Sequence, residues 1–159
     1  MAATDDRQGG AEVLETIVVA VDSSPQHAAI LDAAAELAIA TGAAVHVVTV
    51  ADASCEAGMA LNRSCTGVFT SLGREVDDVL RAACQRLSDK GISCRTHAMS
   101  GLVSERIVDL AVELRAGLIV VGHRHLGWMQ RIFENSVGRD LLEHAPCNVL
   151  IVKEGADAG

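Results

Sequence analysis

Aromatic residues are almost absent from the sequence, which has two Phe, one Trp and no Tyr among its 159 residues. Aromatic stacking is therefore not available as a general binding device, and the core must be built from small and branched aliphatic side chains. Basic residues are also in the minority, so the formal net charge is -8 at pH 7. Nucleic acids and anionic membranes bind to basic faces that displace counterions. We therefore expect no nucleic-acid partner and no membrane partner.

Long apolar runs are missing as well. No stretch of about 18 apolar residues could cross a membrane, and residues 1–15 lack the basic start and apolar middle of a secretory signal. We therefore expect a cytoplasmic protein. Apolar residues make up 50% of the chain, which is enough for one core without metals or disulfides. We expect a flexible N-terminal tail at 1–14, a single domain at 15–153 and a C-terminal tail at 154–159.

The five cysteines are odd in number and include no Cys-x-x-Cys pair, so neither a disulfide framework nor a zinc knuckle is predicted. Reduced thiols are the expectation. Cys55 and Cys65 lie in one irregular stretch, and a redox switch between them stays open as an alternative. His123 and His125 flank Arg124, but two ligands without a nearby carboxylate or thiolate are too few for a dedicated metal site. We therefore predict no metal site.

Strand and helix patterns alternate along the domain. Apolar runs predict buried strands, and a run of alternating polarity predicts an edge strand; the five are 16–21, 44–50, 92–99, 118–121 and 148–152. Helical spacing predicts four helices, at 25–40, 71–90, 104–115 and 136–144, with Ser24, Ser104 and Ser136 as N-caps. This order implies an α/β fold: a doubly wound five-stranded parallel sheet, order 3-2-1-4-5, with four helices in a Rossmann-like sandwich.

That strand order brings the ends of the first and fourth strands together at a switch point, where such sheets bind ligands. Asp22 and Gly122 should meet there. Glycine at this place lets the backbone approach a ligand or turn with a positive φ. The helix that begins at Ser136 offers free amide groups to an anion, and its apolar face should contain Val137, Leu141 and Leu142. A phosphate-sized pocket is therefore predicted at the carboxyl edge of the sheet.

Residues 51–70 carry no sustained helical or strand period. A connection of that length in a compact domain is typical of a functional flap, and we predict a flap over the pocket. No Walker lysine motif, dinucleotide glycine triplet or nucleophile elbow follows any predicted strand. Rapid NTPase, dehydrogenase or hydrolase chemistry is therefore not predicted.

From Glu15 to Lys153 the chain resembles the universal stress protein family. The motifs that carry the resemblance are Val21-Asp22-Ser23, Gly101 at the exit of the third strand, Val121-Gly122, and Asn135-Ser136-Val137 followed by HAPCNVLIV. In ATP-binding members of the family the loop after the fourth strand reads glycine, two residues, glycine, nine residues, glycine, then serine or threonine. Gly122 and Ser136 match this pattern, whereas His125 and Asn135 replace the other two glycines and Gly138 replaces a further hydroxyl.

The resemblance implies an adenine nucleotide, ATP or AMP, with or without Mg²⁺. Asp22 would accept hydrogen bonds from the adenine or the ribose, and Val50 would line the adenine slot. The full set of nucleotide-binding residues implied in this way is Val21, Asp22, Ser23, Val50, Gly101, Val121, Gly122, His123, Arg124, His125, Asn135, Ser136, Val137 and Gly138.

We therefore expect a small stress-response regulator that binds an adenine nucleotide weakly or conditionally, with slow ATP hydrolysis at most and no catalytic residue to name. Two alternatives remain: a dimeric protein-interaction module without nucleotide, and a redox or metal sensor. The last strand, Asn148 to Val152, is apolar and lies at the sheet edge in this topology. The resemblance implies a homodimer in which these strands of two subunits pair.

Overall fold

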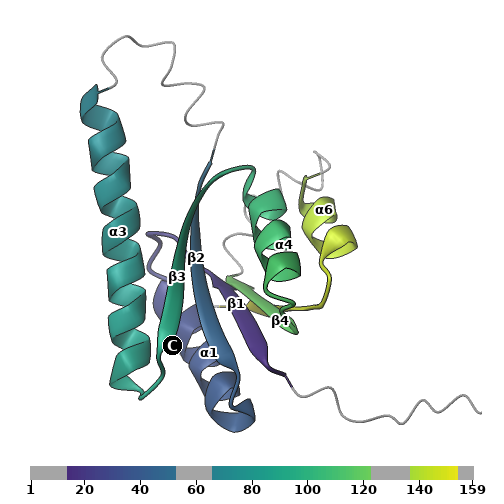
Figure 1. Ribbon diagram of the computed structural model, residues 1–159. Helices are drawn as coiled ribbons and strands as arrows, with labels where there is room; N and C mark the ends of the chain where they lie inside the picture. Colours follow the sequence, from purple (N-terminus) through teal and green to yellow (C-terminus); the bar gives the residue numbers. More distant parts are fainter. Residues whose placement is uncertain (1–13, 53–65, 123–136, 154–159) are drawn as a thin grey trace, which may run out of the picture.

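The computed structural model describes residues 14–52, 66–122 and 137–153. Strands and helices alternate through these residues (Figure 1). The elements are β1 (Thr16–Ala20), α1 (His27–Thr41), β2 (Ala44–Asp52), α3 (Thr66–Asp89), β3 (Cys94–Gly101), α4 (Val103–Glu113), β4 (Leu118–Gly122), α6 (Val137–His144) and β5 (Asn148–Val152).

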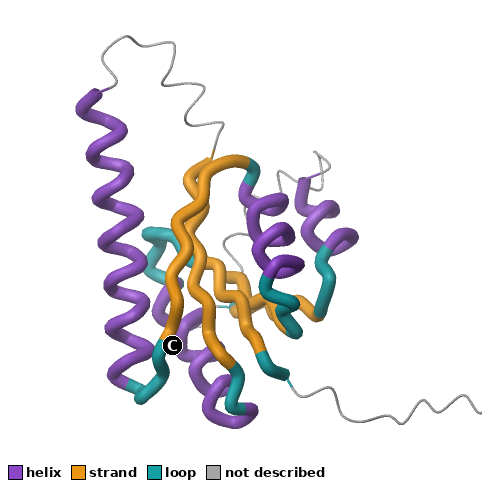
Figure 2. The backbone as a smooth tube through the Cα atoms, viewed as in Figure 1, coloured by secondary structure: helices purple, strands orange, loops and turns teal. Residues whose placement is uncertain are grey.

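The five strands form one sheet in the order β3-β2-β1-β4-β5, and every neighbouring pair is parallel. Helices α1 and α3 cover one face of the sheet and α4 and α6 cover the other (Figure 2). The predicted doubly wound sandwich and its strand order are therefore confirmed. No helix among the described residues is both long and apolar enough to span a membrane.

Two hydrophobic clusters form the core, one on each face of the sheet. In β1, Ile17 and Val19 point toward α1 and α3, whereas Val18 and Ala20 point toward α4. Both sets are buried. A strand covered on both faces needs apolar residues at every position, which explains the run without polar alternation.

Helix α1 begins later than predicted, because a turn precedes it. The Ser24 amide donates to Asp22 Oδ1 at 3.0 Å, which folds these residues into an Asx turn. The Ser24 carbonyl then accepts from the His27 amide at 3.2 Å and from the His27 ring Nδ1 at 2.8 Å. Gln26 occupies the N-cap without a side-chain cap bond. The prediction of Ser24 as N-cap and Pro25 as first helical residue was therefore wrong.

Helix α3 begins earlier than predicted, at Thr66, and β2 continues to Asp52. The irregular connection is therefore shorter than the predicted 51–70, and its residues 53–65 lie outside the described part of the chain. Adding a turn to a formed helix is cheap compared with starting one, so the apolar stripe further along α3 supports these first residues. The flap over the pocket stays a prediction.

Two further details of the helices differ from expectation. Helix α4 begins at Val103 with Leu102 at the N-cap, so Ser104 lies inside the first turn and does not cap the helix. In α6, Leu141 is fully buried, but Leu142 is 49% exposed. A helix of eight residues that packs through a narrow face buries Leu141 and turns its neighbour outward.

An imidazole pair joins β2 to the edge strand β3. His46 Nδ1 lies 3.0 Å from His97 Nε2, and the ring centroids are 5.2 Å apart with an interplanar angle of 22°. The centroids are farther apart than the nitrogens by about two ring radii, so the rings meet end to end. One ring N–H therefore donates to the lone pair of the other ring. His97 is half-buried and Thr96 is exposed, so the alternation along β3 follows the prediction at Cys94 and Arg95 and is reversed from Thr96 onward.

The buried member of this pair is held in its neutral form. Burial lowers the pKa of His46, and the charges of His97 and Arg95 lower it further. Protonation of both facing nitrogens would replace the hydrogen bond with two N–H groups pointing at each other. The pair therefore contributes to the β2–β3 contact only while one facing nitrogen carries no proton.

Candidate functional site

The carboxyl ends of β1 and β4 meet at one edge of the sheet, as the sequence predicted. The paired residues run from Ile17 with Leu118 to Val19 with Val120. Continuing this register by two residues places Val21 beside Gly122. This is the switch point of the sheet, where ligands of doubly wound folds bind.

A small cavity opens at this edge, between the sheet and α3. Its volume is about 150 Å³, and its lining residues are Asp22, Ser23, Thr49, Val50, Ala51, Glu75, Val76 and Val79. It brings together three of the predicted site residues, Asp22, Ser23 and Val50. Pockets for drug-sized ligands measure roughly 300–1,000 Å³, so this cavity fits one part of such a ligand, for example a base or a sugar.

The end of β1 is held in place by backbone and hydroxyl bonds. The Val21 amide donates to the Val48 carbonyl at 3.0 Å, and the buried Thr49 hydroxyl donates to the Val21 carbonyl at 3.1 Å. Asp22 follows directly and accepts from the Ser24 amide. Asp22 is thus positioned by its neighbours at the mouth of the cavity.

Sequence reasoning missed several residues of this cavity. The sequence contained a signal for Thr49, because its hydroxyl stands between Val48 and Val50 in the apolar part of β2. Val76 and Val79 of α3 pack against the core and are partly buried, but they also border the cavity. Glu75 adds a second carboxylate beside Asp22. Two negative groups disfavour a phosphate here and favour ligand groups that donate hydrogen bonds.

Gly122 lies close to side chains of α1 and of the turn before it. A Cβ on Gly122 would lie 2.6 Å from Ile30 Cδ1 and 3.4 Å from Gln26 Oε1, both on the α1 side of the sheet. Its φ is not positive, so the predicted turn with positive φ was wrong. The close approach at this glycine is to α1. Val121, the preceding residue, is buried in the cluster under α4.

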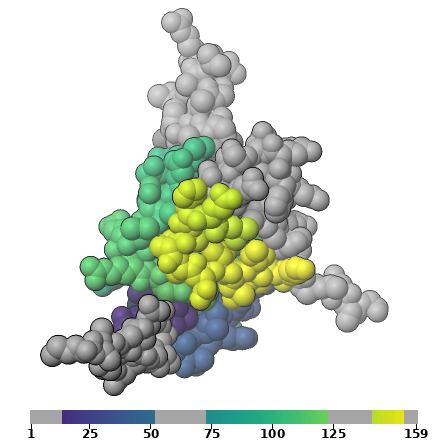
Figure 3. All heavy atoms as spheres, turned by 90° about the vertical axis from the view of Figure 1, so that its right-hand side faces the viewer, coloured from purple at the N-terminus to yellow at the C-terminus, as the bar shows by residue number. Residues whose placement is uncertain are grey.

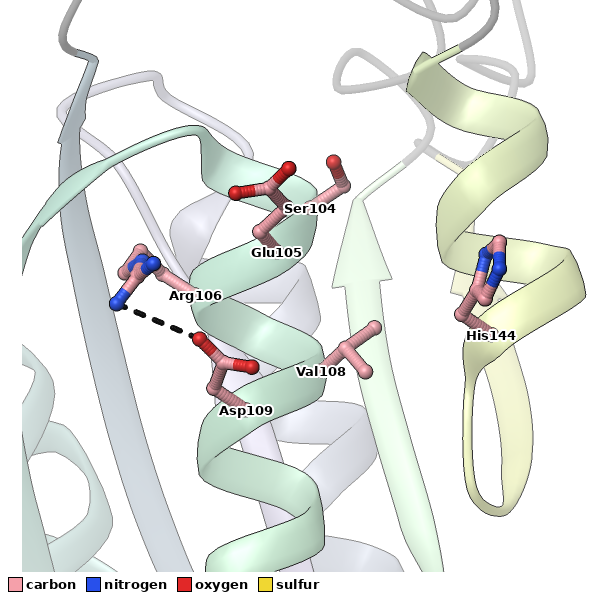
Figure 4. A pocket seen from close by; sticks show the side chains of 6 residues that line it. All are labelled: Ser104, Glu105, Arg106, Val108, Asp109 and His144. Carbon is pink, nitrogen blue, oxygen red and sulfur yellow. Dashed lines mark ion pairs between the residues drawn. The ribbon is translucent and has the colours of Figure 1, made fainter.

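Gly101 lies beside a second cavity, between α4 and α6. Its φ is 131°, and a Cβ there would lie 3.2 Å from Arg106 Nε. The cavity has a volume of about 400 Å³ and is lined by Ser104, Glu105, Arg106, Val108, Asp109 and His144 (Figure 4). The Arg106 guanidinium turns away from α6 and pairs with Asp109 at 3.4 Å, and the buried Ser104 hydroxyl has no hydrogen-bond partner. Gly101 is not among the residues that line the cavity with Asp22.

The loop after β4 lies outside the described residues, and with it five predicted site residues: His123, Arg124, His125, Asn135 and Ser136. Val137 and Gly138 begin α6, directly after Ser136. The anion site at this helix start therefore stays a prediction.

Cys55 and Cys65 also lie outside the described residues. Within the described part of the chain, no group of three or more His, Cys, Asp or Glu side chains could hold a metal ion.

Comparison with known proteins identifies a family. The model of the Universal stress protein family matches residues 14–153. Universal stress protein A homolog 1 of Coxiella burnetii is 32% identical over 142 residues, which cover 86% of this chain and 94% of that protein.

Solved structures agree with this match. The universal stress protein from Archaeoglobus fulgidus in complex with dAMP is 26% identical, with a TM-score of 0.63 over 89% of this chain and 99% of that one. A universal stress protein in complex with cAMP has a TM-score of 0.66 at 23% identity over 89% of this chain and 98% of that one. At that identity the second likeness concerns the fold alone.

Proposed function

This chain belongs to the universal stress protein family, and on that premise we propose that it is a cytoplasmic stress-response regulator that binds an adenine nucleotide. The observation that carries the proposal is the cavity at the switch point, where Asp22, Ser23 and Val50 converge. The dAMP complex of the Archaeoglobus fulgidus relative supports the choice of ligand. Binding without rapid turnover is consistent with the lack of catalytic motifs in the sequence.

The base and ribose belong in the cavity beneath α3. Asp22 accepts hydrogen bonds from the adenine or the ribose hydroxyls, and Val50 contacts the base. Glu75 and Asp22 together repel phosphates, so the phosphates extend away from this cavity toward the start of α6. Free amides and the helix dipole there stabilise an anion. The nucleotide thus spans the carboxyl edge of the sheet.

Binding is weak or conditional, because the loop departs from the pattern of ATP-binding members. His125 and Asn135 replace glycines that leave backbone open to phosphate, and Gly138 replaces a hydroxyl. Restoring both glycines with His125→Gly and Asn135→Gly should strengthen ATP binding by about 1 to 3 kcal/mol. Ser136→Ala should weaken it by about 1 kcal/mol for one lost hydrogen bond.

Calorimetric titration with ATP and GTP, each with and without Mg²⁺, tests the base end of the site. Asp22→Ala should weaken ATP binding roughly 10- to 100-fold, the equivalent of one hydrogen bond to a charged group, and should reduce discrimination against GTP. Asp78→Ala is the matched control, because it removes an acid from the exposed face of α3. If neither the natural protein nor the double glycine variant binds nucleotide at millimolar concentration, the pocket is not a nucleotide site.

A second candidate function is protein interaction through a dimer. Strand β5 is the sheet edge beside β4, and Val149, Leu150 and Ile151 are only half-buried within one chain. Figure 3 shows α6 and β5 at the molecular surface, between α4 and α1. An apolar edge with unpaired backbone groups favours pairing with a second copy of the same strand. We propose a homodimer formed in this way.

A further inference from the structure

The imidazole pair of β2 and β3 places two metal-binding atoms next to each other. His46 Nδ1 lies 3.0 Å from His97 Nε2, although the two residues are 51 positions apart in the chain. In the register of the sheet His97 lies opposite Val48, so it is a diagonal neighbour of His46 on the same face. His46 is 5% exposed, which means that the packing around it fixes its ring. The fold therefore holds two imidazole nitrogens at a defined separation.

The separation of the two nitrogens suits a shared metal ion. With metal–nitrogen bonds of about 2.0–2.1 Å, two nitrogens on one ion are about 2.9 Å apart at a right angle and about 3.3 Å apart at the tetrahedral angle. The observed 3.0 Å lies between these values. To bind an ion, both lone pairs must turn toward one point beside the line that joins the nitrogens. His97 is only half-buried, so its ring can make most of this turn.

Space for the other ligands of the ion lies beside His46. This residue lines a cavity of about 880 Å³ at the amino edge of the sheet, where the turns at Gly42 and Gly91 also border it. A water molecule takes up about 30 Å³, so the cavity has room for the water ligands of an ion. Imidazole nitrogens suit Zn²⁺, Cu²⁺ and Ni²⁺. We propose that His46 and His97 bind a divalent first-row transition cation, with water as its remaining ligands.

Both facing nitrogens must offer a lone pair to the ion. Burial lowers the pKa of His46, so its ring is neutral at neutral pH. In the neutral pair one facing nitrogen carries the proton of the hydrogen bond, and that ring must move this proton to its other nitrogen through solvent. Two nitrogen–metal bonds then replace one hydrogen bond, and no net proton is released. Because the ion is bonded to both strands, it holds the edge strand β3 to β2.

Arg95 limits the affinity of this site for a cation. Among the described residues that line the cavity, Arg95 alone carries a permanent charge, and it pairs with His46 in the register of the sheet. A positive charge close to the ion disfavours its binding, by an amount that salt reduces. Arg95→Gln should therefore tighten the binding of Ni²⁺, most clearly at low ionic strength. A damaged fold could not produce this gain.

Titration of the natural protein with NiCl₂ tests the site directly. The protein carries no histidine tag, and the imidazole ring signals of its six histidines are followed by NMR. Ni²⁺ is paramagnetic, so it broadens the signals of the rings that bind it. We expect substoichiometric Ni²⁺ to broaden the signals of His46 and His97 before those of the other histidines. Calorimetry of the same titration measures the affinity of the ion.

Variants test the assignment of the ligands. Loss of an outer partner of a metal ligand costs roughly 10- to 100-fold in affinity, so loss of a ligand itself in His97→Gln should cost at least as much. His144→Gln is the matched control, because it removes an exposed histidine from the end of α6 and should leave the affinity unchanged. Ni²⁺ should also raise the midpoint of urea unfolding in the natural protein and in the control, but not in His97→Gln.

The titration of the natural protein can overturn the proposal without any variant. It does so if His123, His125 or another histidine is broadened before His46 and His97, or if Ni²⁺ at millimolar concentration broadens no ring signal. An equal affinity of His97→Gln and the natural protein overturns it as well. No nucleotide is present in the test, and His46 precedes Val50 on β2 by roughly 13 Å along the strand. Failure of this site therefore leaves the proposed nucleotide site untouched.

Discussion

Replacing Gly122 by alanine tests whether this residue is a glycine for packing or for ligand access. The new Cβ would lie 2.6 Å from Ile30 Cδ1 and 3.3 Å from Ile30 Cγ1. Ile30 is fully buried and Gln26 is 4% exposed, so neither side chain can move freely into open space. Overpacking of this kind costs about 1 to 3 kcal/mol. We expect Gly122→Ala to lower the free energy of unfolding by that amount.

A double-mutant cycle with Ile30→Val identifies the cause. Removing Cδ1 alone should cost about 0.5 to 1.5 kcal/mol, because it leaves a small cavity. In the presence of alanine at 122 the same change makes room for the new methyl group. The double variant should therefore be more stable than the sum of the single effects by about 1 kcal/mol or more. Urea unfolding with unchanged slopes measures all four free energies.

Two results would refute the packing argument. Additive effects of the two substitutions would show that Ile30 does not oppose the alanine. A loss of ATP affinity that is equal in the Gly122→Ala and double variants would show that the glycine serves the ligand, because relief at Ile30 would then restore nothing. If packing alone matters, the double variant should bind ATP like the natural protein.

Three other predictions concern the imidazole pair, the ion pair of Asp32 with Arg86, and the sheet edge. Burial lowers the pKa of His46 from 6.5, so its contribution to stability is complete above that pH and declines as the pH falls through 6.5 toward the lowered value. In His46→Leu the midpoint of urea unfolding should change less between about pH 7 and pH 5 than it does in the natural protein. An equal change in both proteins would contradict the pH dependence assigned to the imidazole pair. A hydrogen bond from Arg86 at 2.7 Å lowers the pKa of Asp32 below 3.8, so its stabilisation is present above that pH and is lost as the pH falls through the lowered value. The pair is partly exposed, and Asp32→Asn should cost less than about 1 kcal/mol, a loss that salt diminishes. Leu150→Lys should yield a monomer in light scattering, whereas an unchanged mass would place the dimer interface elsewhere.

Most of the fold could be predicted from the sequence, because its determinants are local. A strand covered on both faces must be apolar throughout, and a helix on a sheet must repeat its apolar residues with the helical period. These requirements leave patterns such as Ile17 to Val19 in β1 and Leu80, Ala83 and Leu87 in α3. Alternation of such strands and helices implies parallel pairing, and the observed strand order agrees with the prediction. The approach of Asp22 to Gly122 was predicted because the carboxyl ends of parallel strands share one edge, and the register of β1 with β4 agrees. Val50, which also lines the cavity, was expected there only from the family resemblance.

The structure alone decided which side chains meet. The turn at Asp22 and Ser24 delays α1, although Ser24 and Pro25 are locally suited to begin a helix. Ile30 lies so close to Gly122 that a Cβ there would meet it, and nothing in the residues around Gly122 indicates this contact.

The pair of His46 and His97 likewise joins different strands of the sheet. Periodicity determines which face of an element is apolar, but it contains no information about the residue that the neighbouring element places opposite. That choice depends on strand register and helix position, which are set by the packing of the whole core.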